Sequence, residues 1–130
     1  MTEQRIYYED TDAGGVVYYA NYLRYLERGR TEYLREKGLF VRELHAKGYL
    51  IVVMRLEMDY LIPAVLDDLI RIDTNVLETT NATFTLGQRV GRVSDGAVLV
   101  DSKVTLACLG PGNRARRLPA ELFMVLKEGS

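Results

Sequence analysis

Features that many proteins use for cross-linking, metal binding or membrane insertion are scarce in this chain. It contains one cysteine, Cys108, which excludes an intrachain disulfide and a thiolate metal site. No apolar run approaches the roughly 18 residues that a membrane span needs. The N-terminus lacks the basic and then apolar pattern of a signal peptide. We therefore expect a cytoplasmic protein, with Cys108 as a buried structural thiol.

An excess of positive charge is also missing. The 17 lysines and arginines are balanced by 18 aspartates and glutamates, giving a net charge of −1. Binding nucleic-acid phosphates needs an excess of Lys and Arg, so no nucleic-acid partner is expected. With 48% hydrophobic and 27% charged residues, the composition is typical of a soluble globular protein. The 130 residues are predicted to form one domain, residues 1–130, around one core.

Hydrophobic periodicity predicts an α+β fold. Apolar residues first recur at helical spacing, and later segments alternate apolar with polar residues, as half-buried strands do. The expected helices are 21–37 and 41–47, with a helix start at 118–121, and the expected strands are 5–8, 54–60, 70–76, 84–90 and 98–108. Ser94-Asp95-Gly96 is a strong hairpin signal. The sheet of about five strands is therefore antiparallel, and the long helix must cover its apolar face.

A single long helix cannot protect the whole of such a sheet. One face and one edge stay poorly covered, and an unpaired edge invites pairing with another chain. Symmetric association between identical chains is the common way to cover such surfaces. We therefore expect a homo-oligomer.

The most informative stretch is residues 8–22, YEDTDAGGVVYYANY. It places Asp10, Asp12 and the pair Gly14-Gly15 between a strand-like entry and the long helix. Backbone N–H groups at a helix start lack intrahelical partners and carry partial positive charge. A carboxylate beside them can act as base or nucleophile next to donors that stabilise an oxyanion. This combination suits acyl transfer, whereas capping of the turn is the simpler interpretation of Asp10.

Two other kinds of site use aspartates in a similar arrangement. A calcium loop of the EF-hand type needs an oxygen ligand at its fifth position and Glu at its twelfth, where this chain has Gly14 and Asn21. A phosphoryl-transfer aspartate pair, Asp-x-Asp after a strand, belongs to a parallel sheet with several crossover helices. The later strands here are joined as hairpins. Neither site fits the sequence, and no metal or cofactor is expected.

The chain resembles a known family in these same residues. Residues 7–18, followed by Ala20-Asn21-Tyr22 and residues 25–32, are similar to the hotdog-fold acyl-CoA thioesterases. The nearest branch is the YbgC-like (Tol–Pal-associated) group, which is related to 4-hydroxybenzoyl-CoA thioesterase. Residues 60–64 and 116–119 agree, so the resemblance covers nearly the whole chain. It implies a long central helix wrapped by the sheet, and association into a homodimer or homotetramer.

The resemblance also implies roles for two loop residues. The catalytic carboxylate of the family is the second aspartate of the loop, which corresponds to Asp12. The donor that polarises the substrate carbonyl is a backbone N–H at the helix start, which corresponds to Tyr19. Many YbgC-like members carry His there, but any residue other than proline supplies an N–H. The single histidine, His45, falls in the second helix and is expected to be a surface or packing residue.

Further candidates concern substrate binding. Gly15 lets backbone approach a ligand closely, Tyr18 is a candidate lining residue, and Asn21 either orients the loop or caps the helix. Coenzyme A phosphates favour Arg or Lys, yet residues 78–82 lack the basic cluster of the hydroxybenzoyl enzyme. The remaining phosphate candidates are Arg114, Arg116 and Arg117. Acyl carrier protein in place of free coenzyme A stays an open alternative.

These residues predict an acyl-CoA thioesterase that hydrolyses an acyl thioester to free acid and coenzyme A. Asp12 acts either as general base or as nucleophile through a mixed anhydride, and the sequence leaves both roles open. A hotdog hydratase would need His near the loop, where this chain has none. A non-catalytic acyl-binding or envelope-assembly partner protein of the same fold is the alternative from another class.

Overall fold

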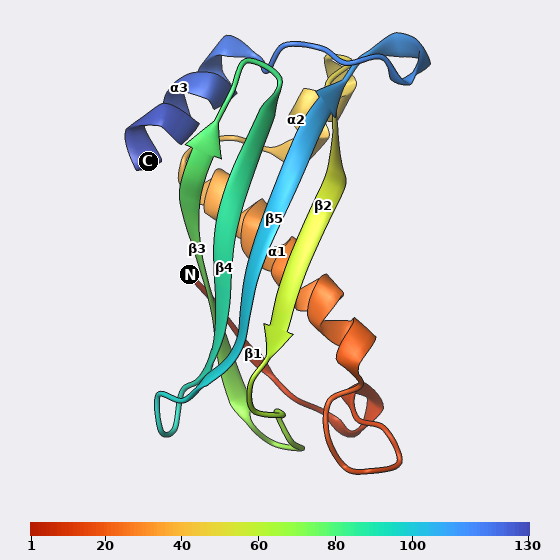
Figure 1. Ribbon diagram of the computed structural model, residues 1–130, viewed down its shortest axis with the longest axis vertical. Helices are drawn as coiled ribbons and strands as arrows, with labels where there is room; N and C mark the ends of the chain where they lie inside the picture. The colour runs from red at the N-terminus through yellow and green to blue at the C-terminus, as the bar shows by residue number, and fades with distance from the viewer.

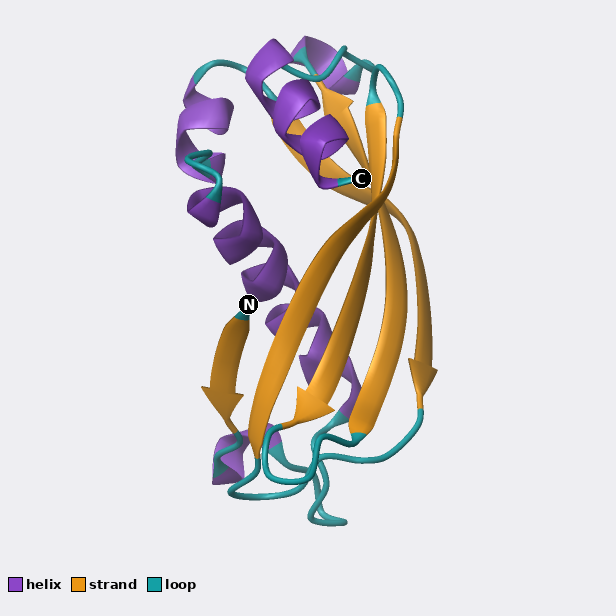
Figure 2. Cartoon of the chain, turned by 90° about the vertical axis from the view of Figure 1, so that its left-hand side faces the viewer, coloured by secondary structure: helices purple, strands orange, loops and turns teal.

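The computed structural model describes residues 1–130, and its strands form one antiparallel sheet around a long helix. The strand order is β1-β3-β4-β5-β2. Figures 1 and 2 show the sheet curving around α1, with α2 and α3 near one end. The element bounds are β1 (Thr2–Arg5), α1 (Tyr22–Glu36), α2 (Val41–Ala46), β2 (Leu50–Tyr60), β3 (Leu69–Thr79), β4 (Thr83–Arg92), β5 (Val98–Leu109) and α3 (Ala120–Gly129). The expected α+β architecture is confirmed.

The prediction for the first strand is wrong. Residues 5–8 were expected to be extended, but β1 ends at Arg5 and a 3₁₀ turn, η1, covers Tyr8–Asp10. Pairing of β1 with β3 sets the strand, from Thr2 opposite Ile72 to Arg5 opposite Leu69. The Asp10 carboxylate then accepts a hydrogen bond from the Tyr7 N–H at 2.8 Å and closes the turn. The terminal helix is also longer than its start at residues 118–121 indicated, and β2 begins four residues earlier, at Leu50, than the expected Met54.

Helix α1 lies close against the sheet at Gly29. A Cβ atom there would lie 2.6 Å from Cγ2 of Ile72 on β3. One turn earlier, the Leu26 carbonyl accepts a hydrogen bond from Nε2 of Gln88 on β4 at 2.9 Å. Gln88 is 1% exposed, and its Nε2 also donates to Oγ1 of Thr74 at 3.0 Å. Close approach and a buried polar contact therefore fix the helix on the sheet together.

The core divides into two clusters along α1. One contains Tyr22, Tyr25 and Leu26 from the N-terminal half of the helix, packed on the nearby ends of β3, β4 and β5. The other contains Leu34 and lies beneath α2 and α3. Cys108 belongs to the second cluster and is fully buried, as expected. Burial raises the pKa of its thiol, so it stays protonated near neutral pH.

Strand β2 leaves one edge of the sheet open. It pairs with β5 alone, and a bulge interrupts this pairing between Val53 and Arg55. The large apolar side chains of Val53, Met54, Leu56 and Tyr60 are exposed on it. Exposed apolar edge strands are templates for pairing with another chain.

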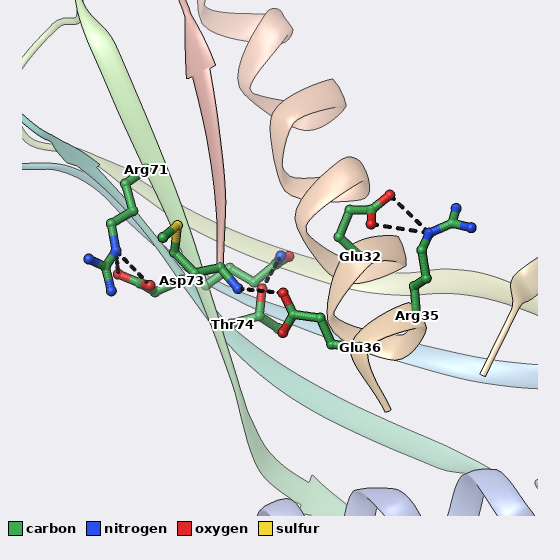
Figure 3. Close-up of polar contacts among 8 residues, drawn as sticks. Glu32, Arg35, Glu36, Arg71, Asp73 and Thr74 are labelled. Carbon is green, nitrogen blue, oxygen red and sulfur yellow. Dashed lines mark hydrogen bonds and ion pairs between the residues drawn. The ribbon is translucent and has the colours of Figure 1, made fainter. Parts of the chain in front are cut away.

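Oppositely charged side chains form pairs on the exposed surface of the fold. Figure 3 shows Arg71 paired with Asp73 on β3 at 3.0 Å, and Arg35 paired with Glu32 on α1 at 3.1 Å. Exposed pairs of this kind contribute little stability, typically about 0.2–1 kcal/mol. No helix combines the length and the apolar character that spanning a membrane requires.

Replacing Gly29 by alanine tests the close approach of α1. Overpacking lowers stability by about 1–3 kcal/mol, and the cost should be near the upper end here because the β-branched Ile72 side chain is stiff. Alanine has a higher helix propensity than glycine, which offsets about 1 kcal/mol of this cost. We expect Gly29→Ala to lower the free energy of unfolding by about 1–2 kcal/mol in urea titrations. Arg24→Ala, at an exposed position of the same helix, should change it by less than about 0.5 kcal/mol. Equal stability of the two variants would contradict the close approach.

Candidate active site

The carboxylate loop, residues 10–18, folds back on itself. The Asp12 N–H donates to the Val16 carbonyl at 2.9 Å, and the Gly15 N–H donates to the Asp12 carbonyl at 3.0 Å. The Tyr18 N–H closes the loop on the Asp10 carbonyl at 3.0 Å. Gly15 has a φ of +81°, a conformation that costs other residues about 1–2 kcal/mol. The glycine is therefore required by the turn itself.

The Asp12 side chain lies at the exposed tip of this loop. Its Oδ1 accepts a hydrogen bond from the Gly14 N–H at 2.8 Å, an Asx-type turn. A Cβ on Gly14 would lie 3.2 Å from this oxygen, so glycine leaves room for the carboxylate. One oxygen is thus oriented by backbone while the other accepts no hydrogen bond from the chain. Such a carboxylate is oriented and remains accessible to a ligand or a water molecule.

The start of the helix follows the loop directly. The 3₁₀ turn η2 (Tyr19–Asn21) runs into α1. The N–H groups of Tyr19 and Ala20 donate to no acceptor within the chain. Free N–H groups at a helix start, together with the helix dipole, attract negative charge. An oriented carboxylate and unused backbone donors therefore lie on one short segment of the chain.

Asn21 orients the loop and does not cap the helix. Its backbone is already helical, and its side chain makes no capping bond, so the N-cap interpretation is wrong. Its Nδ2 instead donates to the Asp10 carbonyl at 3.0 Å. That carbonyl also accepts the Tyr18 N–H, so both ends of the loop meet at one oxygen.

A second segment, residues 60–65, supports the loop from the other side. The Val17 N–H donates to the Ala64 carbonyl at 2.9 Å, and the Ala64 N–H donates to the Tyr22 hydroxyl at 3.2 Å. Burial raises the pKa of Tyr22, so the phenol stays neutral. The Tyr60 hydroxyl donates to the Tyr19 carbonyl at 3.2 Å. The end of β2 is thereby tied to the start of the helix.

Aromatic side chains gather where the loop meets the helix start. The rings of Tyr18 and Tyr19 lie 5.0 Å apart, and those of Tyr19 and Tyr60 lie 6.4 Å apart. Tyr18 is 46% exposed, so this candidate lining residue is not part of the core. Tyr22 is a core residue. The exposed rings of Tyr18, Tyr19 and Tyr60 therefore lie next to one another where the loop meets the helix start.

The segment between β5 and α3, which contains the three candidate arginines, lies at the end of the molecule opposite the carboxylate loop, as Figure 1 shows. The β5 residue Leu99 contacts the segment after β2, whereas Leu109 pairs with Ala115. About ten strand residues at ~3.3 Å each separate the two ends, roughly 33 Å. The structure does not bring arginines and carboxylate loop together within one chain.

The arginines also differ in their contacts. The Arg116 guanidinium lies 3.8 Å from the ring centre of Tyr49 and donates to the Gly48 carbonyl at 3.0 Å. These contacts hold the connection between α2 and β2 and occupy the Arg116 guanidinium. Arg114 and Arg117 are exposed and form no ion pair. Only these two are free to meet a phosphate. His45 is exposed on α2, in agreement with the sequence.

The sequence did not predict an apolar cavity of about 260 Å³ between α1, α2 and the inner face of the sheet next to β2. Leu34, Val41, Ile51 and Phe84 belong to its apolar walls, and Glu27, Arg30 and Thr31 line it from the helix. Alternation identified the inward side chain of Phe84 on β4, but it identified neither Ile51 on β2 nor the place where the inward side chains fail to fill the space. A larger hollow, about 520 Å³, lies on the charged outer face of the sheet, away from the loop.

Comparison with known proteins agrees with this geometry. The model of the thioesterase-like superfamily matches residues 7–125. The acyl-CoA thioesterase YbgC of Haemophilus influenzae is 45% identical over 83% of this chain and 79% of its own length. The acyl-CoA thioester hydrolase YbgC of Escherichia coli is 35% identical over 95% and 92%. A crystal structure of a probable thioesterase from Bartonella henselae has a TM-score of 0.84 and 36% identity, covering 91% of this chain and 97% of that one.

The chain therefore belongs to the thioesterase-like superfamily. Its five-stranded sheet wrapped around one long helix is the hotdog fold.

Removing the Asn21 amide tests how the loop is held. Asn21→Ala removes one half-buried hydrogen bond, and such a bond contributes about 1 kcal/mol to the stability of the closed loop. Local opening of the loop then becomes more frequent, so the Tyr18 amide should exchange with deuterium roughly fivefold faster. Exchange at buried strand amides such as Leu86 should stay unchanged. If Tyr18 exchanges as in the parent protein, Asn21 does not hold the loop.

Proposed function

We propose that the chain hydrolyses acyl-CoA thioesters, using the Asp12 carboxylate and the Tyr19 N–H. Family membership makes it a thioester hydrolase, and the residue roles are the further step. One observation carries them: an oriented, accessible carboxylate lies on the closed loop, and unused backbone donors lie on the helix start that directly follows it. The names of the YbgC relatives, as acyl-CoA thioesterases or thioester hydrolases, support acyl-CoA as the substrate.

The chemistry follows from these two groups. The substrate carbonyl oxygen would face the Tyr19 N–H, which opposes the negative charge that develops during attack. Removing one such donor typically costs about 10²–10³ in rate. As a base, Asp12 takes a proton from water while the water oxygen bonds to the acyl carbon. The carbon–sulfur bond then breaks, and the proton passes to the departing thiolate.

Asp12 has a second route open to it. As a nucleophile, its carboxylate oxygen bonds directly to the acyl carbon and the thiolate leaves. Water then hydrolyses the mixed anhydride and regenerates the carboxylate. Both routes yield free acid and coenzyme A and use the same donor, so the two differ in the bond Asp12 forms.

We also propose that the enzyme works as a homodimer joined through β2. Antiparallel pairing of two β2 edges would put the Tyr60 end of one strand opposite the Leu50–Ile51 end of the other. The carboxylate loop of one protomer would then lie near the arginine-bearing end of its partner. Arg114 and Arg117 would there face the phosphates of coenzyme A or of an acyl carrier protein. We expect this enzyme in the cytoplasm, and a homotetramer would be built from such dimers.

Exchanging the carboxylate for an amide tests the role of Asp12. We expect Asp12→Asn to lower kcat on a panel of acyl-CoAs by at least about 10², with folding intact, because the amide is neither base nor nucleophile. Asp73→Asn, on the charged outer face of the sheet, serves as the matched control with unchanged kcat. Unchanged turnover in Asp12→Asn would remove Asp12 from the mechanism. No turnover on any thioester by the parent protein would favour a non-catalytic acyl-binding or envelope-assembly role.

A charge on the open edge tests the dimer. Leu56 is 37% exposed on β2, and lysine on an edge strand opposes pairing with another strand. We expect Leu56→Lys to shift the protein towards monomer in sedimentation velocity over a range of concentrations. Leu77→Lys, at an exposed apolar position of β3, should leave the dimer intact. A parent protein that sediments as a monomer at all concentrations would rule out this assembly.

A further inference from the structure

Arg30 is a half-buried cation on the wall of the apolar cavity. It lies on the side of α1 that faces β2, and the aliphatic and aromatic side chains of Leu34, Ile51 and Phe84 line the same space. Its Nη1 donates to Oε1 of Gln88 at 3.1 Å. A neutral amide oxygen is the one acceptor that the guanidinium finds in the chain. A guanidinium carries five N–H donors, so most of them lack a protein partner.

No carboxylate lies within 4.0 Å of the Arg30 guanidinium, although other arginines are paired. Arg92, for comparison, contacts both Asp68 and Asp95 at 3.0 Å. Burial lowers the pKa of Arg30 and outweighs the opposite effect of Glu27, so its charge is poorly compensated. A poorly solvated, unpaired cation is costly unless an anion joins it.

The surroundings of the cavity mouth favour an anion over a cation. Glu27 is the one acidic residue on the wall, and its carboxylate accepts a hydrogen bond from the Thr31 hydroxyl at 3.2 Å. Arg24 lies beside it on the neighbouring surface of α1, whereas Arg28 donates a hydrogen bond to Gln4 on β1 at 2.8 Å. Positive groups therefore outnumber negative ones where the cavity opens along the helix.

We propose that this cavity receives the acyl group of the substrate and that Arg30 selects acyl groups ending in a carboxylate. Monothioesters of short dicarboxylic acids are the class that fits. The cavity of about 260 Å³ has room for a short acyl chain. A glutaryl group offers an apolar middle to the walls and a carboxylate to the planar guanidinium fork.

The acyl group reaches this cavity from the partner's loop. Within one chain, Tyr19 lies at the helix start and Arg30 lies eleven residues further along the same helix. At ~1.5 Å for each helical residue the two are roughly 16 Å apart, farther than a glutaryl group extends. In the dimer proposed above, Asp12 of one protomer meets the cavity and Arg30 of its partner. This assignment therefore rests on the proposed function and its dimer.

A matched pair of substrates tests the selection. Glutaryl-CoA and pentanoyl-CoA have acyl chains of equal carbon number and differ in the terminal carboxylate. A charge-assisted hydrogen bond between the Arg30 guanidinium and the terminal carboxylate, in a half-buried site, corresponds to about tenfold or more in kcat/KM. We therefore expect the parent enzyme to prefer glutaryl-CoA over pentanoyl-CoA by about this factor. Arg30→Met should abolish the preference and Arg30→Lys should keep part of it. Arg35→Met, an exposed arginine paired with Glu32 on the same helix, should leave it unchanged.

The ratio of kcat/KM for glutaryl-CoA to kcat/KM for pentanoyl-CoA distinguishes selection by Arg30 from a structural role of Arg30. Arg30 also supports Gln88, and losing that support would lower kcat/KM for both substrates equally. Equal loss on both substrates, or a parent enzyme without preference for glutaryl-CoA, would overturn the selection while leaving the proposed thioesterase intact. Binding of the S-(4-carboxybutyl) and S-pentyl thioethers of coenzyme A, measured by calorimetry, repeats the comparison without catalysis. Tighter binding of the carboxylate analogue in a protein without hydrolytic activity would support the site and refute the thioesterase.

Mixed dimers test whether Arg30 acts across the interface. Co-expression of Asp12→Asn and Arg30→Met chains produces heterodimers. If each site takes Asp12 from one protomer and Arg30 from the other, one of the two sites in a heterodimer keeps both residues and the other site loses both. Activity on glutaryl-CoA should then recover to about a quarter of the parent level, since about half of randomly mixed dimers are heterodimers with one intact site. No recovery above the weighted sum of the two variants would overturn the composite cavity.

Discussion

The contact of α1 with the sheet at Gly29 and Gln88 is the constraint on which the rest of the structure depends. A missing side chain lets the helix come close to β3, and a buried amide from β4 bonds a carbonyl of the helix itself. The first sets the distance between the two layers and the second sets the rotation and axial position of the helix. The helix start, with its free N–H groups, lies where it does because this contact fixes the axis behind it. Arg30 faces β2 for the same reason.

Much of this architecture could be predicted from the sequence because it follows from periodicity. The inward positions of β3 and β4, such as Ile72 and Phe84, alternate with polar residues, and the Ser94-Asp95-Gly96 turn joins β4 to β5. The first strand could not be placed this way. Its position depends on pairing with a strand some 70 residues later in the chain, and Tyr7 and Tyr8 look extended until the Asp10 carboxylate closes the turn.

The candidate site shows the same division between local and long-range information. Asp12 and the glycines after it are recognisable because their roles depend on neighbours in sequence. Asn21 was open to two interpretations because both involve nearby residues, and the bond to the Asp10 carbonyl decides between them. The partners of Arg30 and Arg116 come from distant segments, Gln88 and Tyr49–Gly48, so nothing in the local pattern separates a half-buried arginine from a solvated one.

The buried amide of Gln88 also discriminates against wrongly paired versions of this sheet. Side chains along a strand alternate between the two faces, so a slip of β4 by a single position would turn Arg89 towards the helix and send Gln88 outwards. The misaligned chain would then bury the charged Arg89 side chain beneath α1. The Gln88 amide would face outwards and could no longer donate to the Leu26 carbonyl of the helix. One neutral polar side chain, fully bonded in a single alignment, thereby penalises neighbouring registers that an all-aliphatic strand would tolerate.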